Sequence, residues 1–253
     1  MSATRAIAPL VALGAALAAC TAAPIDVATL VPDSLTDDLV AHWRFDDTDT
    51  TVRDSSGNGR DGVVVGTTSS WIQGKFGGAL HFDRMDQVTV AQFPQATLSY
   101  SVAAWLRVDM VDFDAPSPTL LTTAFATGGG GWALNAVVGP PPGNYGFTYS
   151  VGSSLSDTVD VDCACFDIGP WVHLAAVLDA STSTLTLYLN GIQRDRATHV
   201  PSIMRGQTTL TMAHGAVPGR MLFGALDDVV IYSRALVPEE IMRLTQNAAP
   251  DPQ

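Results

Sequence analysis

The stretch Leu39-Val-Ala-His-Trp-Arg-Phe-Asp46 places an apolar side chain at every second position, at Leu39, Ala41, Trp43 and Phe45. Successive side chains of a β-strand point to opposite faces of the sheet, so this period of two predicts a strand with one buried face. Short apolar or alternating runs of the same kind follow along the rest of the chain. The segments between them are rich in Gly, Pro, Asp and Ser, which favour turns.

The other predicted strands cover residues 63–65, 79–82, 87–91, 99–108, 119–126, 132–138, 145–151, 159–166, 171–178, 184–190, 208–213 and 222–232. We expect residues 79–82 and 87–91 to pair as a hairpin around Asp83-Arg-Met-Asp86, and Asn190-Gly191 to form a tight hairpin turn. Many short strands with little helix predict an all-β fold of two antiparallel sheets packed as a sandwich.

One short helix is expected near the C-terminus. Pro238 suits a first helical turn, and Glu239 and Glu240 suit the positive N-terminal end of a helix dipole. Ile241 and Leu244 would form its buried side. These two glutamates are the only ones in the chain, so nearly all of its acidic residues are aspartates, which favour loops over helices.

The composition is that of a folded, acidic protein. Of the 253 residues, 47 % are hydrophobic and 15 % are charged, which argues against disorder. The formal net charge is −12, so the chain repels nucleic acid and anionic lipid, and we expect neither as a partner.

The N-terminus is expected to be an export signal. Residues 7–17 form an apolar run too short to span a membrane, and Leu17-Ala-Ala-Cys20 follows it. This run resembles the lipobox of bacterial lipoproteins, which implies cleavage before Cys20 and lipidation of that cysteine. The alternative is an ordinary signal peptide with an Ala-x-Ala site. Thr21, rather than aspartate, follows the cysteine, which favours the outer membrane or cell surface over the inner membrane.

The expected organisation is therefore a signal peptide (residues 1–19), a lipidated cysteine with a tether (20–37), one domain (38–246) and a tail (247–253). The membrane would be reached through the lipid on Cys20. In the oxidising compartment this implies, Cys163 and Cys165 could form a disulfide. In a regular strand two such side chains share a face but lie too far apart to bond without a bulge, so a disulfide and two free thiols both stay open.

Seven segments, in order along the chain, carry a family resemblance: Leu39–Asp46, Asp54-Ser-Ser-Gly-Asn-Gly-Arg-Asp-Gly62, Gly74-Lys-Phe-Gly-Gly-Ala-Leu-His-Phe-Asp83, Ser101-Val-Ala-Ala-Trp-Leu-Arg107, Trp171-Val-His-Leu-Ala-Ala-Val-Leu-Asp179, Leu185-Thr-Leu-Tyr-Leu-Asn-Gly191 and Gly224-Ala-Leu-Asp-Asp-Val-Val-Ile-Tyr-Ser-Arg-Ala-Leu236. They resemble laminin-G-like, concanavalin A-like jelly-roll domains. The resemblance implies a two-sheet antiparallel jelly-roll β-sandwich with a short C-terminal helix. It leaves the function open, because this fold hosts lectins, adhesion domains, glycoside hydrolases and lyases.

Catalytic motifs are missing from the sequence. Hydrolases of this fold usually carry a Glu-x-Asp-x-Glu strand, which is impossible here because Glu239 and Glu240 belong to the expected helix. There is no Gly-x-Ser-x-Gly segment, and the five histidines are scattered. We therefore expect a protein that is not an enzyme.

A structural calcium ion is the one cofactor that the sequence suggests. Calcium binds clustered carboxylate and carbonyl oxygens, and many relatives of the resembled family hold one. The candidate ligands are Asp46, Asp54, Asp227 and Asp228, because the first and last strands of such sandwiches usually lie side by side. The alternative is that these are ordinary turn aspartates.

Aromatic residues are the candidates for ligand binding. Trp43, Trp105 and Trp171 stand mid-strand beside aliphatic residues and are expected in the core. Trp132, Tyr145 and Tyr149 are the best candidates for a sugar platform, against the alternative of a buried strand face.

The leading hypothesis is thus a non-catalytic surface domain that binds a carbohydrate or an extracellular protein. The alternatives are a structural or adhesion protein of the envelope, and a cryptic glycoside hydrolase or lyase.

Overall fold

The computed structural model describes residues 34–94, 98–110, 119–123, 131–138, 145–152, 158–198, 200, 209–215 and 221–249. Of residues 137–138, 145–152 and 158–166 it describes the backbone alone. Among all these residues, no helix has the length and apolar character needed to cross a membrane.

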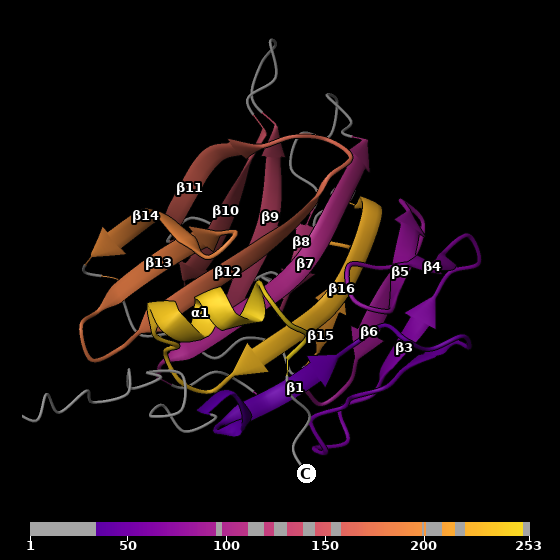
Figure 1. Ribbon diagram of the computed structural model, residues 1–253, viewed down its shortest axis with the longest axis horizontal. Coiled ribbons are helices and arrows are strands. Elements are labelled where there is room, and N and C mark those ends of the chain that lie inside the picture. The colour runs from indigo at the N-terminus through magenta and orange to yellow at the C-terminus, as the bar shows by residue number, and fades with distance from the viewer. Residues whose placement is uncertain are drawn as a thin grey trace, which may run out of the picture. The chain divides into compact units, whose positions relative to one another are not determined.

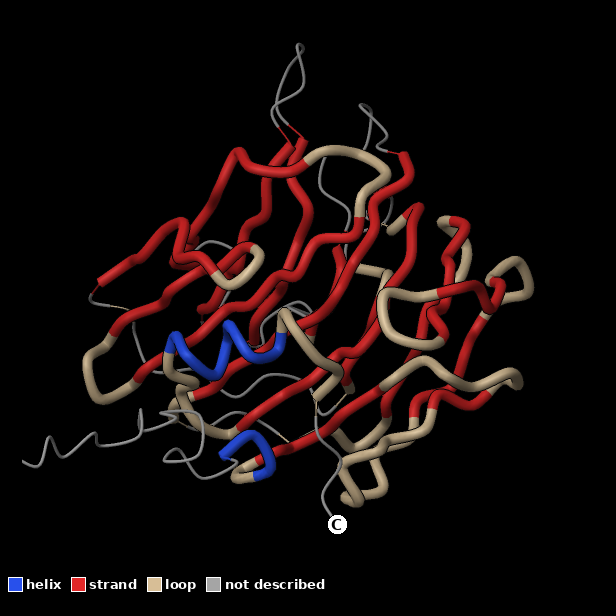
Figure 2. Tube along the Cα trace, in the orientation of Figure 1, coloured by secondary structure: helices blue, strands red, loops and turns tan. Residues whose placement is uncertain are grey.

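Two antiparallel sheets make up the fold (Figures 1 and 2). Sheet A contains β1 (Leu39–Trp43), β4 (Ser70–Gln73), β5 (Gly78–Asp83), β7 (Tyr100–Met110), β12 (Trp171–Asp179), β13 (Thr184–Leu189), β14 (Ile192–Thr198) and β16 (Phe223–Tyr232). Its order is β14-β13-β12-β7-β16-β5-β4, and β1 also pairs with β16. The expected proximity of the first and last strands is therefore confirmed.

Sheet B contains β2 (Thr51–Val52), β3 (Gly62–Val65), β6 (Gln87–Val90), β8 (Thr119–Thr122), β9 (Gly131–Val138), β10 (Tyr145–Gly152), β11 (Thr158–Phe166) and β15 (Leu210–Met212). Its order is β11-β10-β9-β8-β15-β6-β3-β2. The two sheets confirm the predicted all-β sandwich, whose main hydrophobic core contains residues of both sheets.

Strand β7 shows how sheet A separates two environments. Its residues Val102, Ala104, Leu106 and Val108 belong to the main core. Because side chains alternate along a strand, Ser101, Ala103, Trp105 and Arg107 lie on the other side, which we call the outer face of sheet A.

Helix α1 (Pro238–Leu244) covers part of this outer face (Figure 1). Its buried residues Ile241 and Leu244 join a second apolar cluster that contains Ala103 of β7 and Ala175 of β12. This confirms the predicted helix and its buried side. The rest of the outer face, towards Trp105 and Arg107, lies beyond this cluster.

One predicted hairpin is wrong. Strand β5 pairs with β4 and β16 in sheet A, whereas β6 pairs with β3 and β15 in sheet B. Residues 84–86 carry the chain from one sheet to the other, and Phe82 and Val88 on either side of them both belong to the core that the sheets share. The other predicted turn is confirmed: Asn190 and Gly191 have φ values of +50° and +78° between β13 and β14.

The packed unit extends past both expected domain limits. A 3-10 helix spans Ser34–Thr36, and Leu35 is 3 % exposed in the second apolar cluster, within the stretch expected to be a tether. Ala249, in the expected tail, is 4 % exposed and belongs to the same cluster. Cys20 and the expected signal peptide lie outside the described residues.

Candidate functional site

The loop after β1 is organised by Asp54. Asp54 Oδ1 accepts hydrogen bonds from the backbone N–H groups of Ser56 and His42, both at 3.0 Å, and Oδ2 accepts one from Arg60 N at 2.9 Å. Gly57 and Gly59 have φ values of +80° and +71°, which favour glycine. Both oxygens of this carboxylate are thus used to hold its own loop against β1.

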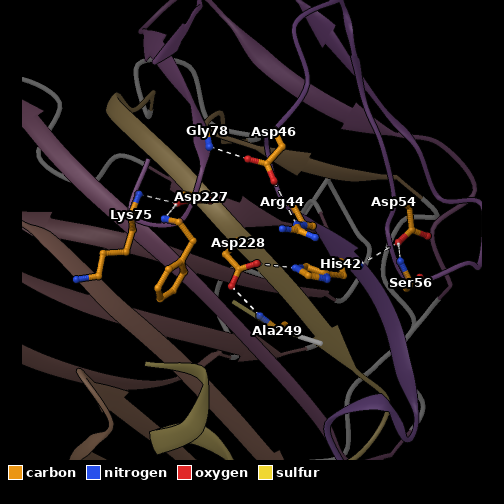
Figure 3. A network of polar contacts seen from close by, with 11 residues as sticks. His42, Arg44, Asp46, Asp54, Ser56, Lys75, Gly78, Asp227, Asp228 and Ala249 are labelled. Carbon is orange, nitrogen blue, oxygen red and sulfur yellow. Dashed lines mark hydrogen bonds and ion pairs between the residues drawn. The ribbon is translucent and has the colours of Figure 1, made fainter. Parts of the chain in front are cut away.

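Asp228 joins three parts of the chain. The pairing of β16 with β7 is irregular between Asp227 and Val230, and Asp228 has a φ of +48°. Its Oδ1 lies 2.5 Å from His42 Nε2, and its Oδ2 accepts a hydrogen bond of 3.0 Å from Ala249 N (Figure 3). This carboxylate therefore links β1, β16 and the segment after α1. Its partner His42 is fully buried, so the link lies away from solvent.

Asp46 and Asp227 hold the turn Gly74–Gly78, which joins β4 to β5. Asp227 Oδ2 accepts hydrogen bonds from Lys75 N at 2.7 Å and Phe76 N at 2.9 Å. Asp46 Oδ1 accepts one from Gly78 N at 2.6 Å, and Asp46 Oδ2 pairs with Arg44 Nε at 3.2 Å (Figure 3). A Cβ on Gly74 would lie 2.6 Å from Asp227 Oδ2, so the close approach of this turn requires glycine.

These four aspartates do not fit the shared calcium site that the sequence suggested. Calcium needs six to eight oxygen ligands that converge on one point. Both oxygens of Asp46, Asp54 and Asp228 already have partners, of which most are backbone N–H donors. In the part of the chain that the structure describes, no three His, Cys, Asp or Glu side chains are arranged to hold a metal ion. The register does bring these residues near one another, but Asp46 and Asp227 hold the Gly74–Gly78 turn, whereas Asp54 and Asp228 hold other segments.

A row of three buried polar side chains crosses the outer face of sheet A. The register places His173 of β12 opposite Trp105 of β7, and Trp105 opposite Asp227 of β16. The rings of Trp105 and His173 have centroids 5.4 Å apart. The exposed fractions of His173, Trp105 and Asp227 are 2 %, 5 % and 0 %. We call these three residues the polar row.

The Gly74–Gly78 turn covers the polar row. Phe76 packs edge-on against Trp105 with centroids 5.9 Å apart, and Lys75 Nζ lies 4.4 Å from the centroid of the same ring. Each member of the row has a buried polar atom that finds no hydrogen-bond partner within the described residues: His173 Nδ1, Trp105 Nε1 and Asp227 Oδ1. Such atoms are uncommon in folded proteins and call for an explanation.

Burial also changes the pKa values in the row. Desolvation lowers the pKa of His173 to about 3, so its imidazole is neutral at physiological pH. Desolvation raises the pKa of Asp227 to about 7, against the opposing effect of the Phe76 hydrogen bond, and the neighbouring carboxylates of Asp228 and Asp46 raise it further.

A second group of side chains, partly exposed, continues from the row along the same face. Arg107 lies opposite Trp171 in the register, and its Cζ is 5.5 Å from the centroid of the Trp171 ring. Arg107 Nε donates to Asp109 Oδ1 at 2.7 Å, and His81 Nε2 lies 3.1 Å from Asp109 Oδ2. The His81 ring packs edge-on against Phe223 at 5.3 Å. We call Trp171, Arg107, Asp109, His81 and Phe223 the aromatic strip.

The expectations for the tryptophans are corrected in two cases. Trp43 is fully buried in the main core, as predicted. Trp105 is buried, as expected, but it lies with the half-buried Trp171 on the outer face of sheet A and not in the main core, because both occupy the strand positions that alternate with the core residues. The sequence does not distinguish a tryptophan of the main core from one on the outer face of sheet A, since these strands carry apolar residues on both faces.

The expected sugar platform is corrected at Trp132 and stays untested at Tyr145 and Tyr149. Trp132 is 1 % exposed in the main core and packs on Tyr100 at 5.4 Å, so it cannot offer its ring to a ligand. The side chains of Tyr145 and Tyr149 lie outside the described residues; their backbones pair with Val138 and Leu134.

The cysteine pair stays a prediction. Tyr145 pairs with Phe166 and Gly146 with Ala164, which leaves Cys165 as an extra residue at an irregularity next to Cys163. Their side chains also lie outside the described residues.

Comparison with solved structures finds the same fold in other proteins. Domain 4 of AbnA, a GH43 extracellular arabinanase from Geobacillus stearothermophilus, solved in complex with arabinotriose, is 23 % identical with a TM-score of 0.65, over 83 % of this chain and 98 % of that one. The binding domain of botulinum neurotoxin DC in complex with rat synaptotagmin II is 16 % identical with a TM-score of 0.67, over 84 % of this chain and 52 % of that one. The binding domain of Paraclostridial Mosquitocidal Protein 1 is 16 % identical with a TM-score of 0.65, over 83 % and 52 %.

Sequence identities this low show a shared fold and no more. This chain spans about half the length of the two toxin binding domains. A search of curated proteins found no match. The family model described as the concanavalin A-like lectin/glucanases superfamily matches residues 82–242, from β5 to α1. The chain belongs to this superfamily.

Proposed function

We propose that this protein is a non-catalytic domain that binds a carbohydrate on the outer face of sheet A. The aromatic strip is the observation that carries the proposal. Trp171 is half-buried beside Arg107 and Asp109, whose side chains are 25 % and 22 % exposed. An apolar ring next to planar donors and acceptors is the combination that recognises a sugar, which has both apolar C–H faces and hydroxyl groups.

The similar structures are consistent with this choice. The AbnA domain was solved with arabinotriose, which is a carbohydrate. A neurotoxin binding domain was solved with synaptotagmin II, so the same fold also binds a protein. We favour a carbohydrate because the strip alternates rings with charged groups and does not form a broad apolar patch.

The positions of the glutamates support a non-catalytic role. Glycoside hydrolysis needs two carboxyl groups on either side of the scissile bond. Glu240 is buried and pairs with Arg234 at 2.7 Å, and it also accepts a hydrogen bond from Val237 N at the start of α1. Its carboxylate therefore stabilises the C-terminal segment.

The proposed place of action is the bacterial envelope. The Leu17-Ala-Ala-Cys20 segment supports lipidation of Cys20, and a diacylated cysteine gives firm membrane attachment. The domain would then face the exterior at the outer membrane or cell surface. Replacing Cys20 by Ala should release the protein from the membrane fraction, with loss of the acyl mass on its N-terminal peptide.

A glycan array with the purified chain tests the proposed function. The Trp171→Ala variant is expected to lose at least tenfold in affinity for whatever glycan the wild type binds. Met242→Ala, an exposed change on α1, is the control and should bind normally. If no glycan binds saturably, or if Trp171→Ala binds as well as the wild type, carbohydrate recognition by the strip is wrong.

A further inference from the structure

We propose that the polar row is a covered subsite for a hydroxyl group of a neutral sugar, which opens when the Gly74–Gly78 turn lifts. The proposal rests on the proposed function, since the row would extend the site that begins at the aromatic strip. It starts from three buried side chains, His173, Trp105 and Asp227, that stand in one register across three adjacent strands.

The first argument is the concentration of unpartnered polar atoms. Trp105 Nε1, His173 Nδ1 and Asp227 Oδ1 are all buried, and within the described residues none of them has a hydrogen-bond partner. A buried polar atom that loses its water without gaining another partner destabilises the folded state. Three such atoms on neighbouring residues therefore mark a place where the chain keeps hydrogen-bonding capacity that its own fold does not use.

The second argument is the chemistry of those atoms. Trp105 Nε1 is a donor, a carboxylate oxygen is an acceptor, and a neutral imidazole nitrogen is one or the other according to its tautomer. A hydroxyl group can accept a hydrogen bond from the indole and donate one to His173 or Asp227. A metal cation would meet the indole N–H, and an anion would meet the Asp227 carboxylate, so a neutral polyhydroxyl ligand matches the row best.

The third argument is the cover. Asp227 Oδ2 accepts the Lys75 and Phe76 N–H groups, so the same carboxylate that fixes the turn points its other oxygen into the row without a partner. Lys75 is exposed and Phe76 is half-buried, and both lie over Trp105. Lifting the turn would take both side chains off the indole ring and both N–H groups off Asp227.

The fourth argument is position. Trp171 and Arg107 occupy the same strands as His173 and Trp105, two residues further along. Two residues of a strand span about 7 Å, which is comparable to the size of one sugar ring. An oligosaccharide stacked on Trp171 could thus place a hydroxyl of its next unit at the row.

Indole N–H signals in NMR spectra provide the test. The probe is a panel of methyl glycosides of neutral pentoses and hexoses, added at millimolar concentration to the whole chain. We expect the Trp105 signal, identified by its loss in Trp105→Phe, to shift saturably with at least one glycoside and to exchange more slowly with water. Trp43 is the internal control, because its Nε1 already donates to Arg60 O at 2.8 Å and its signal should not move.

The signals separate this proposal from the proposed function. A shift at Trp171 without one at Trp105 leaves sugar binding intact and overturns the subsite. A shift at Trp105 alone supports the subsite and overturns the strip. If neither signal moves, both are wrong. A methyl glucuronide or calcium chloride that shifts Trp105 while neutral glycosides do not would overturn the assignment to a neutral hydroxyl.

Variants give a second readout. Trp105→Phe and His173→Phe keep an aromatic ring and remove one polar atom each. If the row is a subsite, both variants should weaken glycoside binding about tenfold while their melting temperatures stay equal to or above that of the wild type. Unchanged affinity in both would show that the row is an internal packing feature. Lys75→Ala, which uncovers the indole, should accelerate association, and an unchanged association rate would overturn the role of the turn as a cover.

Discussion

Asp227 and Asp228 are neighbours in sequence, yet they belong to two polar clusters that differ in kind. Asp228 uses both oxygens to join His42 and Ala249. Asp227 uses Oδ2 to hold the Gly74–Gly78 turn, and its Oδ1 has no hydrogen-bond partner among the described residues. The same holds for Trp105 Nε1 and His173 Nδ1 in the polar row. The first cluster is explained by the fold that it ties together. The second has hydrogen-bonding capacity left over, which is what a binding site needs.

The largest expected effect comes from breaking the first cluster. Asp228→Ala would leave His42 Nε2 and Ala249 N without their acceptor in a buried environment. Each buried donor that loses its acceptor costs about 1–3 kcal/mol, and two donors lose theirs, so we expect a loss of about 2–6 kcal/mol. Urea unfolding measures it, with the exposed Asp49→Ala as control. A loss below about 1 kcal/mol would contradict the structural role of this cluster.

The pH dependence of stability should reveal the polar row. Asp227 has a pKa of about 7 in the folded state against 3.8 ordinarily, so its contribution to stability is lost as the pH rises from about 4 to 7. His173 has a pKa of about 3 against 6.5 ordinarily, so its contribution is lost as the pH falls through the same window. Each effect amounts to at most about 1.4 kcal/mol per pH unit, and the two oppose each other.

Single variants should therefore change the slope of stability against pH in opposite directions between pH 4 and 6.5. Asp227→Asn should make stability rise more steeply with pH, and His173→Phe should make it fall. The charged groups near Asp227 are Asp46, Asp228 and Lys75, and they are unchanged in both variants. Urea melts at several pH values, with chelator present, measure the slopes. Parallel profiles in the two variants would mean that the row does not hold its groups in the unusual protonation states described.

Two tryptophans allow a matched comparison of a satisfied and an unsatisfied indole. Trp43→Phe removes a donor whose acceptor, Arg60 O, stays partly buried, so a loss of about 1–3 kcal/mol is expected. Trp105→Phe removes a donor without a described partner and should leave the stability unchanged or raise it. The free energies of unfolding of the two variants provide the comparison. Equal losses would place Trp105 among ordinary core residues.

The smallest expected effect concerns metal ions. Because both oxygens of Asp46, Asp54 and Asp228 already have protein partners, calcium should not raise the melting temperature above that given by sodium at equal ionic strength. Screening of a protein with net charge −12 would act equally with either salt. Thermal melts with chelator, calcium, magnesium and matched sodium decide this. A specific stabilisation by calcium would show that the aspartates rearrange around an ion and would reopen the sequence-based prediction.

Part of the site could be read from the sequence. The sequence singles out Asp54, Asp227 and Asp228 as carboxylates that come close to the first strand. The hydrogen-bond partners of these carboxylates were not predictable. Those of Asp227 lie in the Gly74–Gly78 turn, and one partner of Asp228, Ala249, lies beyond α1. The members of the polar row were missed. Trp105 was assigned to the core and His173 was one of several scattered histidines, since nothing local distinguishes the outer face of sheet A from the inner one.

Local patterns in the amino-acid sequence are enough to specify the features that depend on near neighbours along the chain. Alternation specified the strands, the Asn190-Gly191 pair specified a turn with positive φ, and Pro238 with the following glutamates specified α1, because dihedral preference and side-chain period act over a few residues. The tertiary structure alone decided which strands lie side by side and which face is covered. It sent β5 and β6 to different sheets and put His173, Trp105 and Asp227 in one row. The physical reason is that these contacts join residues far apart in sequence, which meet only when burial of both sheets' apolar faces fixes the strand order and register.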